Sequence, residues 1–282
     1  MDIEALRSFL AFVDTGSFTR AAKQTFKTQS AVSMQMKRLE SELGKPLFEK
    51  QGRNLNLTKD GQSLALYARQ LLQLHDDTLN QIKGQDVETV IRLGCPDDYA
   101  ESVLPNFVRL LRKEIPSLDL QIVCTPSNRV RMMLDSGRLD IGIVSRPAGS
   151  EEGYLLSNDR GVWLIGEDKS LLEQRPIPLV LLQKECQYYA SATEGLTKKQ
   201  IPFKVVASCA SAVALTGLIR SGQAIGALAI QNTGEGISIL EEDWLPPLPA
   251  VDIVLVTSSI ARNKFPADLA QRLSDKYQTE YS

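Results

Sequence analysis

Apolar residues in the stretch 28–43 recur with the period of a helix. Intervals of four, three and four residues separate Val32, Met36, Leu39 and Leu43, so these side chains share one face. We expect that face to pack against a core. The stretch therefore predicts an amphipathic helix that leaves its other face exposed.

The exposed face of this helix carries groups suited to a DNA groove. Gln29, Ser33 and Lys37 follow at steps of four residues, with Ser30 and Met34 one position round. An amide can read a purine edge, a serine can approach bases or phosphate, and a lysine can reach phosphate or guanine. For this helix alone, an ordinary amphipathic surface helix is the alternative interpretation.

The preceding sequence supplies the rest of a helix-turn-helix. An apolar stripe over residues 6–13 predicts a first helix that ends at Gly16, and Ser17 is placed to cap a second short helix over 18–23. A turn at residues 25–27 then leads into the helix described above. This spacing is typical of a helix-turn-helix.

The following sequence predicts a hairpin beside the recognition helix. Residues 46–50 and 55–58 read as two short strands, joined at residues 51–54 by a tip that contains glycine and asparagine. Arg53 at that tip could enter the minor groove, where the negative potential is strongest. The hairpin is therefore predicted to act as a wing.

Together these motifs resemble the amino-terminal domain of LysR-type transcriptional regulators. The resemblance rests on residues 6–9, 16–22, 29–33, 39–40, 43–44, 47–48, 52–53 and 57–61. It covers residues 2–62 closely and implies a winged helix-turn-helix that binds double-stranded promoter DNA. Residues 92–99 resemble the LrhA/HexA-like branch of this family.

Two positions depart from the family. Met34 and Lys50 stand where the family usually has arginine, so any DNA contact there would be weaker or different in kind. The candidate DNA-contacting residues are Ser17, Arg20, Thr28, Gln29, Ser30, Ser33, Met34, Lys37, Arg38 and Arg53.

Residues 59–84 predict one long helix without proline. Thr58 can cap this helix, and Asp60 lies favourably in its first turn. Its apolar positions alternate by four and three, and we expect a second copy of the helix to cover them, because the winged domain is small. An intradomain core helix is the alternative. The candidate dimerisation residues are Leu64, Ala68, Leu71, Leu72, Leu79 and Ile82.

Beyond residue 85 predicted strands alternate with helices. Strands are expected at 90–94, 118–123 and 141–144, with helices at 100–114 and 129–136 between them. This order predicts an α/β domain with parallel strand pairing. Residues 137–143 again resemble the LysR-type family, whose effector domain has the fold of periplasmic solute-binding proteins.

The predicted organisation has three parts. A winged helix-turn-helix domain occupies residues 1–58, a linker helix 59–84, and an α/β effector-binding domain 85–282. Subdomain I of the effector domain would hold about 88–160 and 258–282, and subdomain II about 161–257. Further elements are expected at 161–165, 178–182, 203–207, 211–220, 251–256 and 266–277.

In such a fold a ligand lies at the carboxyl ends of strands, between the two halves. Arg146 could hold a carboxylate, whereas Asp97 and Asp98 would favour a cation or a polar neutral ligand. Capping of a helix is the alternative role for the two aspartates. Ala224 and Ala229 stand where the family has glycine and proline, which would alter the wall of the site. The candidate effector-binding residues are Cys95, Asp97, Asp98, Ser127, Asn128, Ser145, Arg146, Ser208 and Ser211.

Charge is unevenly distributed along the chain. The formal net charge is −2, yet residues 1–59 hold ten Lys or Arg against six Asp or Glu, and residues 85–282 hold twenty against twenty-five. A basic head on an acidic body can bind phosphate at one end. The sequence has no apolar run near the roughly 20 residues of a membrane span, and its acidic start is unlike a signal peptide. We therefore expect a cytoplasmic protein.

The cysteines do not indicate a metal site. Cys95, Cys124, Cys186 and Cys209 lie at no metal-ligand spacing, and the sequence has one histidine, His75. We expect free thiols, no metal and no cofactor. A redox pair of Cys186 and Cys209, as in the peroxide-sensing members of the family, is disfavoured because few cations flank them to lower a thiol pKa.

The whole arrangement predicts a ligand-responsive transcription regulator that is not an enzyme. Its expected partners are double-stranded promoter DNA, a small-molecule effector, RNA polymerase and further copies of itself, as a homodimer and homotetramer. An architectural DNA-binding protein is one alternative. A solute-binding protein or enzyme on the same framework is disfavoured, because the sequence has no nucleotide-binding glycine loop and no paired catalytic His, Ser or Cys set.

Overall fold

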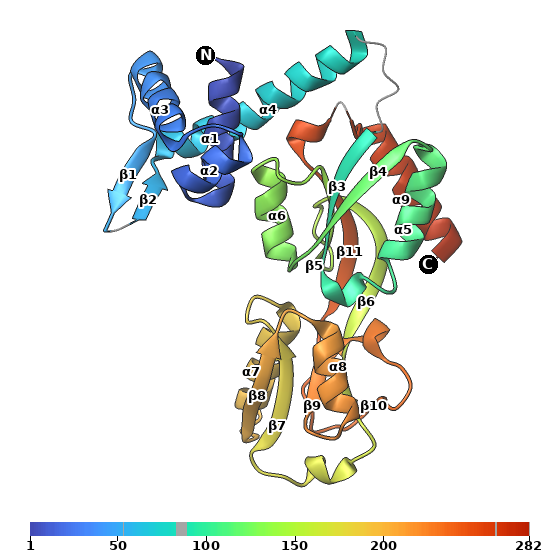
Figure 1. Cartoon of the computed structure of the whole chain (residues 1–282). Coiled ribbons are helices and arrows are strands. Elements are labelled where there is room, and N and C mark those ends of the chain that lie inside the picture. Colours follow the sequence, from blue (N-terminus) through green and yellow to red (C-terminus); the bar gives the residue numbers. More distant parts are fainter. Residues whose placement is uncertain (53, 83–88, 263, 282) are drawn as a thin grey trace. The chain divides into compact units, whose positions relative to one another are not determined.

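In the computed structural model the chain forms two compact units, one built from α1 to α4 and the other from β3 to α9 (Figure 1). The structure describes residues 1–52, 54–82, 89–262 and 264–281. Within these residues there is no helix long and apolar enough to cross a membrane.

The first unit is a helical domain with a two-stranded hairpin. Its elements are α1 (Ile3–Thr15), α2 (Phe18–Gln24), α3 (Gln29–Leu43), β1 (Phe48–Gln51), β2 (Asn54–Leu57) and α4 (Lys59–Ile82). Strands β1 and β2 pair antiparallel, as expected of a wing. Gly16 and Gly44, with φ of 66° and 65°, adopt the left-handed conformation that ends α1 and α3.

Side-chain caps begin three of these helices, and Asp2 Oδ1 caps α1 by accepting from the Glu4 N–H at 3.3 Å. Thr28 Oγ1 accepts a hydrogen bond from the Ala31 N–H at 3.2 Å, and Thr58 Oγ1 accepts one from the Gly61 N–H at 3.0 Å. Ser17 occupies the cap position of α2, but its side chain makes no capping bond. The prediction that the Ser17 side chain caps α2 with a hydrogen bond is therefore wrong.

The core of the first unit forms where the helices meet the hairpin. Val32, Met36 and Leu39 of α3 are buried as predicted, whereas Leu43 is 39% exposed because it is the last residue of the helix. Four phenylalanine rings from α1, α2 and β1 pack edge-on or tilted, with centroids 4.5 to 5.9 Å apart. These contacts hold the hairpin against the helices.

The long helix α4 divides its apolar residues between two surfaces. Leu64, Ala68 and Leu72 pack into the core of their own unit, so the expectation that they face a second copy is wrong for these three residues. They lie beside α1, which covers the first half of the helix. A second stripe stays exposed and consists of Tyr67, Leu71, Leu74, Leu79 and Ile82.

The second unit is an α/β domain. Its elements are β3 (Thr89–Cys95), η1 (Asp97–Tyr99), α5 (Leu104–Glu114), β4 (Leu118–Cys124), α6 (Ser127–Asp135), β5 (Ile141–Pro147), β6 (Tyr154–Ile165), η2 (Lys169–Leu172), β7 (Ile177–Leu182), α7 (Gln187–Lys198), β8 (Phe203–Cys209), α8 (Ala212–Arg220), β9 (Ile225–Ala229), η3 (Ile230–Asn232), β10 (Ser238–Leu240), β11 (Ala250–Thr257), η4 (Ser259–Ala261) and α9 (Ala267–Tyr281).

Strand β6 runs through both halves of this domain. The strand order is β4-β3-β5-β11-β6-β9-β7-β8, with β10 also paired to β6. The start of β6 pairs with β11 and its end pairs with β9, so one strand belongs to both subdomains (Figure 1). Pairs β3–β4 and β3–β5 are parallel, which confirms the predicted βαβαβ start.

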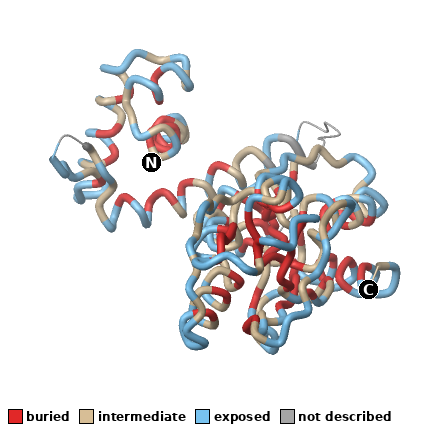
Figure 2. The backbone as a smooth tube through the Cα atoms, turned by 90° about the horizontal axis from the view of Figure 1, so that it is seen from below, coloured by how far each residue is buried: buried red, intermediate tan, exposed pale blue. Residues whose placement is uncertain are grey.

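Buried residues concentrate along the central strands of this domain (Figure 2). Helices α5 and α9 pack against the core of subdomain I, and α7 and α8 cover opposite faces of the subdomain II sheet. The unpredicted α7 buries Tyr188, Ala192 and Leu196 at steps of four residues. Its Thr, Ser, Tyr and Gly residues are weak helix formers, so packing rather than propensity selects the helix.

Candidate functional site

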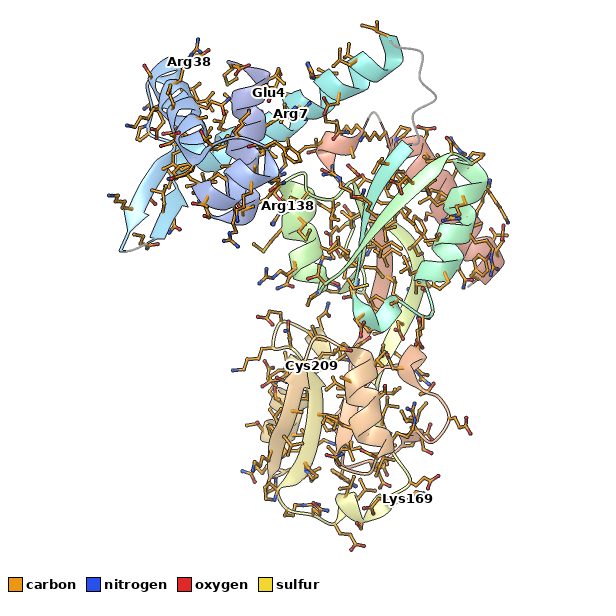
Figure 3. The ribbon with its side chains drawn as sticks, in the orientation of Figure 1. Glu4, Arg7, Arg38, Arg138, Lys169 and Cys209 are labelled. Atoms are coloured by element: carbon orange, nitrogen blue, oxygen red, sulfur yellow. The ribbon has the colours of Figure 1, made fainter. Side chains whose placement is uncertain are left out.

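The recognition helix α3 presents most of its predicted DNA-contacting residues to solvent. Gln29, Ser30, Lys37 and Arg38 are exposed, and Figure 3 labels Arg38 on this helix. Met34 is 69% exposed. This polar face with one apolar side chain can reach base edges and phosphates in a major groove.

The remaining DNA-contact candidates surround this face. Arg20 and Thr28 are exposed, whereas Ser17 and Ser33 are half-buried. The hydroxyls of Thr28 and Ser30 lie 3.0 Å apart at the start of α3. Arg53, at the tip of the hairpin, lies outside the described residues.

A polar network that the sequence patterns did not reveal anchors the start of α3. The Lys27 ammonium donates to the Glu4 carboxylate at 3.0 Å and to the Ser8 hydroxyl at 3.1 Å, and Figure 3 labels Glu4 on α1. Ser8 is fully buried, and its hydroxyl lies 2.7 Å from Gln35 Oε1. The network joins the turn before α3, at Lys27, and the middle of α3, at Gln35, to α1, so it helps to fix the orientation of α3 relative to α1.

A crevice opens in the second unit where β3, β5 and β7 end. It encloses about 650 Å³, its open mouth included, which is enough for a small molecule. Cys209, labelled in Figure 3, ends β8 directly before the lining residue Ala210. The lining residues are Pro96, Asp97, Asp98, Pro126, Ser127, Asn128, Arg131, Ser145, Leu182, Gln183, Glu185, Cys186, Gln187 and Ala210.

The structure brings together part of the predicted effector site. Asp97, Asp98, Ser127, Asn128 and Ser145 all line the crevice. Ser211 instead lines an adjoining side hollow, and its hydroxyl caps α8 by accepting from the Ala214 N–H at 3.3 Å. The predicted residues at the ends of β3, β4 and β5 therefore meet at one crevice, and their role in effector binding stays a prediction.

Three candidates lie away from the crevice. Cys95 is fully buried, and its thiol donates to the Pro96 carbonyl. Arg146 points to the opposite face from Ser145, where its Nε donates to the Asp252 carboxylate at 3.2 Å and its other nitrogen bonds the Glu152 carbonyl, so it cannot hold a ligand carboxylate. Ser208 is exposed on the edge strand β8 and lines none of the described hollows that adjoin the crevice.

Several lining residues were missed by sequence reasoning. Gln183, Glu185, Cys186 and Gln187 follow β7, a strand that was predicted but to which the strand-end rule was not applied. Arg131 lies inside α6, one turn beyond the helix start, where no strand-end signal reaches. Its guanidinium donates to both Glu152 oxygens, at 2.7 and 2.6 Å, and this bonding lowers the pKa of Glu152.

The two aspartates of η1 have different roles. Asp97 Oδ2 accepts from the Ala212 N–H at 2.8 Å, so Asp97 of subdomain I caps helix α8 of subdomain II. Burial raises the pKa of Asp98 to about 7, with the charges of Asp159 and Asp97 acting in the same direction. The capping alternative therefore applies to Asp97, and Asp98 remains available to a ligand.

The thiols show no sign of a sensor or a metal site. All four cysteines are free, and burial raises the pKa of Cys186 to about 11, which keeps its thiol protonated. In the part of the chain that the structure describes, there is no group of three or more His, Cys, Asp or Glu side chains arranged for a metal ion.

Comparison with known proteins places both units in one family. Residues 3–62 match the model of the lysR family of bacterial regulatory helix-turn-helix proteins, and residues 84–258 match the LysR substrate binding domain. The regulator DgdR of Burkholderia cepacia is 33% identical over 256 residues, which cover 90% of this chain and 87% of DgdR. PecT of Dickeya dadantii is 30% identical over 250 residues, covering 88% and 79%.

Solved structures share this fold at low sequence identity. Full-length OxyR of Pseudomonas aeruginosa superposes with a TM-score of 0.65 at 19% identity, covering 99% of this chain and 95% of OxyR. CbnR complexed with its target DNA has a TM-score of 0.58 at 17% identity, covering 97% of this chain and all of CbnR. LysG of Corynebacterium glutamicum, with bound effector Arg, has a TM-score of 0.60 at 18% identity, covering 98% and 99%. The chain belongs to the LysR family of DNA-binding transcriptional regulators, with a helix-turn-helix domain followed by a LysR substrate binding domain.

Proposed function

We propose that this regulator reads promoter DNA through α3 and the hairpin, and that a small-molecule effector bound in the crevice controls it. The observation that carries the proposal is the pairing of an exposed base-reading face on α3 with an enclosed polar crevice at the strand ends of a separate unit. The two sites suit two different ligands. A protein that only shaped DNA would have no use for the second site.

The proposed DNA contacts divide into readers and anchors. Gln29 and Ser33 would contact base edges, while Lys37, Arg38, Arg20 and the hairpin tip would contact phosphate. Met34 would add an apolar contact, for example to a thymine methyl group, where the family usually has arginine. The relative CbnR was solved on its target DNA, which supports a DNA-facing role for the equivalent helix here.

The proposed dimer forms through the exposed stripe of α4. Tyr67, Leu71, Leu74 and Ile82 follow at steps of four, three and eight residues, which is the seam of a two-helix contact. Such a stripe on a surface helix indicates a partner rather than solvent. The seam predicted from the sequence also contained Leu64, Ala68 and Leu72. These three residues are left out of the proposed seam because they are buried in their own unit.

The proposed tetramer forms through the effector domains. Strands β4 and β8 end the sheet order and expose Ile122 and Val206, at 44% and 47%. Edge strands with exposed apolar residues are suited to pairing between copies. Contact with RNA polymerase would then couple the assembled regulator to transcription in the cytoplasm, and residues 92–99 support placing it in the LrhA/HexA-like branch.

Recovery of crosslinked genomic DNA followed by binding isotherms tests the proposed function. The full chain should bind a recovered promoter about 10³-fold or more tightly than random DNA of equal length. A metabolite that occupies the crevice should change the footprint on that promoter. Equal affinity for promoter and random DNA would instead support the architectural alternative.

A further inference from the structure

Acidic side chains line the crevice, and Asp98 is the one whose surroundings are the least balanced in charge. Asp98 lines the crevice and also a second hollow on the α8 side, of about 790 Å³ with its open mouth. Its carboxyl has no ion pair among the described residues. Asp97 also lines both hollows, but its carboxylate caps α8, so Asp98 is the shared carboxyl that is left without such a partner.

Two almost fully buried polar side chains lie against Asp98 and lack a complete set of partners. Asp159 is 5% exposed, and in the described structure its Oδ2 has no hydrogen-bond partner, although Oδ1 accepts from the Arg160 N–H at 2.7 Å. Tyr188 is 2% exposed, and its hydroxyl also lacks a partner among these residues. Both groups interact electrostatically with Asp98. Neither side chain lines the crevice or the second hollow, so both act as buried polar surroundings of Asp98 and not as ligand contacts.

The cation that lines the crevice is already paired with a carboxylate. Among the described residues that line the crevice, Arg131 carries the positive charge, and both oxygens of Glu152 hold it. Arg220 lines the second hollow, and its Nε donates to the Glu235 carbonyl at 3.0 Å. Glu185 in the crevice and Glu101 in the second hollow add further negative charge. Among the described lining residues of the crevice, the carboxyls of Asp97, Asp98 and Glu185 therefore outnumber Arg131, whose charge Glu152 balances, while Arg129 lines the adjoining side hollow. This excess of carboxyls favours a cation over an anion in the crevice.

We propose that the effector carries a cationic group, an ammonium, amidinium or guanidinium, that pairs with the Asp98 carboxylate at the base of the crevice. This inference rests on the effector site proposed above. The cation would be the charge partner that Asp98 lacks among the described residues. Asn128, Gln183 and Gln187 at the mouth would bind the polar remainder of the molecule.

The same placement suggests how the cation would be sensed. Asp97, the neighbour of Asp98 in η1, reaches across to cap α8, so η1 is attached to both subdomains. A cation on Asp98 would shift η1 or hold it in place relative to α8. A ligand changes a regulator only through different affinities for two arrangements, and this element is positioned to distinguish them.

The test uses the full chain and three four-carbon probes that differ in charge: 1,4-diaminobutane, 1,4-butanediol and succinate. Thermal melting and calorimetric titration are measured for the wild type, for Asp98→Asn and for the exposed control Asp243→Asn. We expect the diamine to stabilise the wild type and Asp243→Asn, with at least a tenfold loss of affinity in Asp98→Asn. Promoter binding by Asp98→Asn should be retained, which shows that the variant is folded.

A second readout separates pairing from a structural effect. Because the pKa of Asp98 is about 7, diamine affinity should rise about tenfold between pH near 6 and near 8, as the carboxyl loses its proton. Asp98→Asn should lose that dependence. The other ionisable groups facing Asp98 are Asp97, Asp159, Tyr99, Tyr188, Cys95 and Cys186. Burial raises the pKa of Asp159 to about 6, so this carboxyl loses its proton at the lower end of the range, whereas burial raises the pKa values of both tyrosines and both thiols further above it.

Failure of the inference is distinguishable from failure of the proposed function. Stabilisation by succinate alone, by none of the probes, or equally in Asp98→Asn would overturn the cation inference. Suppose that succinate binds the wild type and that Asn128→Leu combined with Ser145→Leu blocks this binding. The proposed effector site would then stand, although the cation inference would be overturned. If no ligand that binds the wild type is affected by that double variant, the crevice is not the effector site.

Discussion

Replacing Asp98 with asparagine should stabilise the unliganded protein in a pH-dependent way. Burial raises the pKa of this carboxyl from 3.8 to about 7, so the folded state holds a proton that the unfolded state has already lost. Folding stability therefore falls as pH rises from about 4 to about 7. Asparagine cannot ionise, so the variant does not show this fall.

The expected gain follows from the size of the shift. About three pH units correspond to roughly 4 kcal/mol above pH 7, and the cost of burying an amide reduces the net gain to about 2–4 kcal/mol. At about pH 5.5 the gain should be smaller by about 2 kcal/mol, because Asp98 is then mostly neutral in the folded state. Near pH 8 the melting temperature of the effector domain should rise by roughly 5–10 °C.

The measurement is thermal melting of the full chain at both pH values. Wild type, Asp98→Asn and Asp243→Asn are compared, since Asp243 is exposed and its substitution should change the melting temperature by less than about 1 °C at either pH. An unchanged or lower melting temperature of Asp98→Asn near pH 8 would refute the reasoning. A gain of the same size at both pH values would show that packing, and not ionisation, is responsible.

The other predictions concern assembly, readout and control. Leu71→Asp combined with Leu74→Asp should give monomers in sedimentation without unfolding the head, because both side chains are exposed; an unchanged dimer would place the seam elsewhere. Gln29→Ala should weaken cognate binding by about 1–3 kcal/mol and leave random DNA unaffected; equal losses in binding isotherms would remove Gln29 from the readers. Asn128→Leu combined with Ser145→Leu should abolish the inducer response in a reporter while DNA affinity stays within about threefold; an intact response would contradict the crevice site.

The fold of the first unit was predictable from the sequence because its helix caps, helix ends and apolar periodicity all favour the same elements. Helix ends at Gly16 and Gly44, caps at Thr28 and Thr58 and the period of α3 all follow from the properties of single residues. The seam of α4 was placed incorrectly because two stripes overlap on one helix. The period alone cannot say which stripe meets α1 and which meets solvent, since Leu71 and Leu72 are adjacent in sequence yet face different surroundings.

The crevice was harder to predict because side-chain direction depends on register. The strand-end rule places residues near the crevice, but alternation along β5 sends Ser145 into it and its neighbour Arg146 to the opposite face, where Asp252 lies in register across β11. The sequence also cannot show that Asp97 finds a helix N-terminus while Asp98 finds no charge partner, because the Ala212 N–H lies far along the chain in the other subdomain. The character of the site thus depends on that pairing: with Asp97 bonded to α8 and Arg146 to Asp252, Asp98 is the one of the three charged residues predicted at the strand ends that is left to face a ligand.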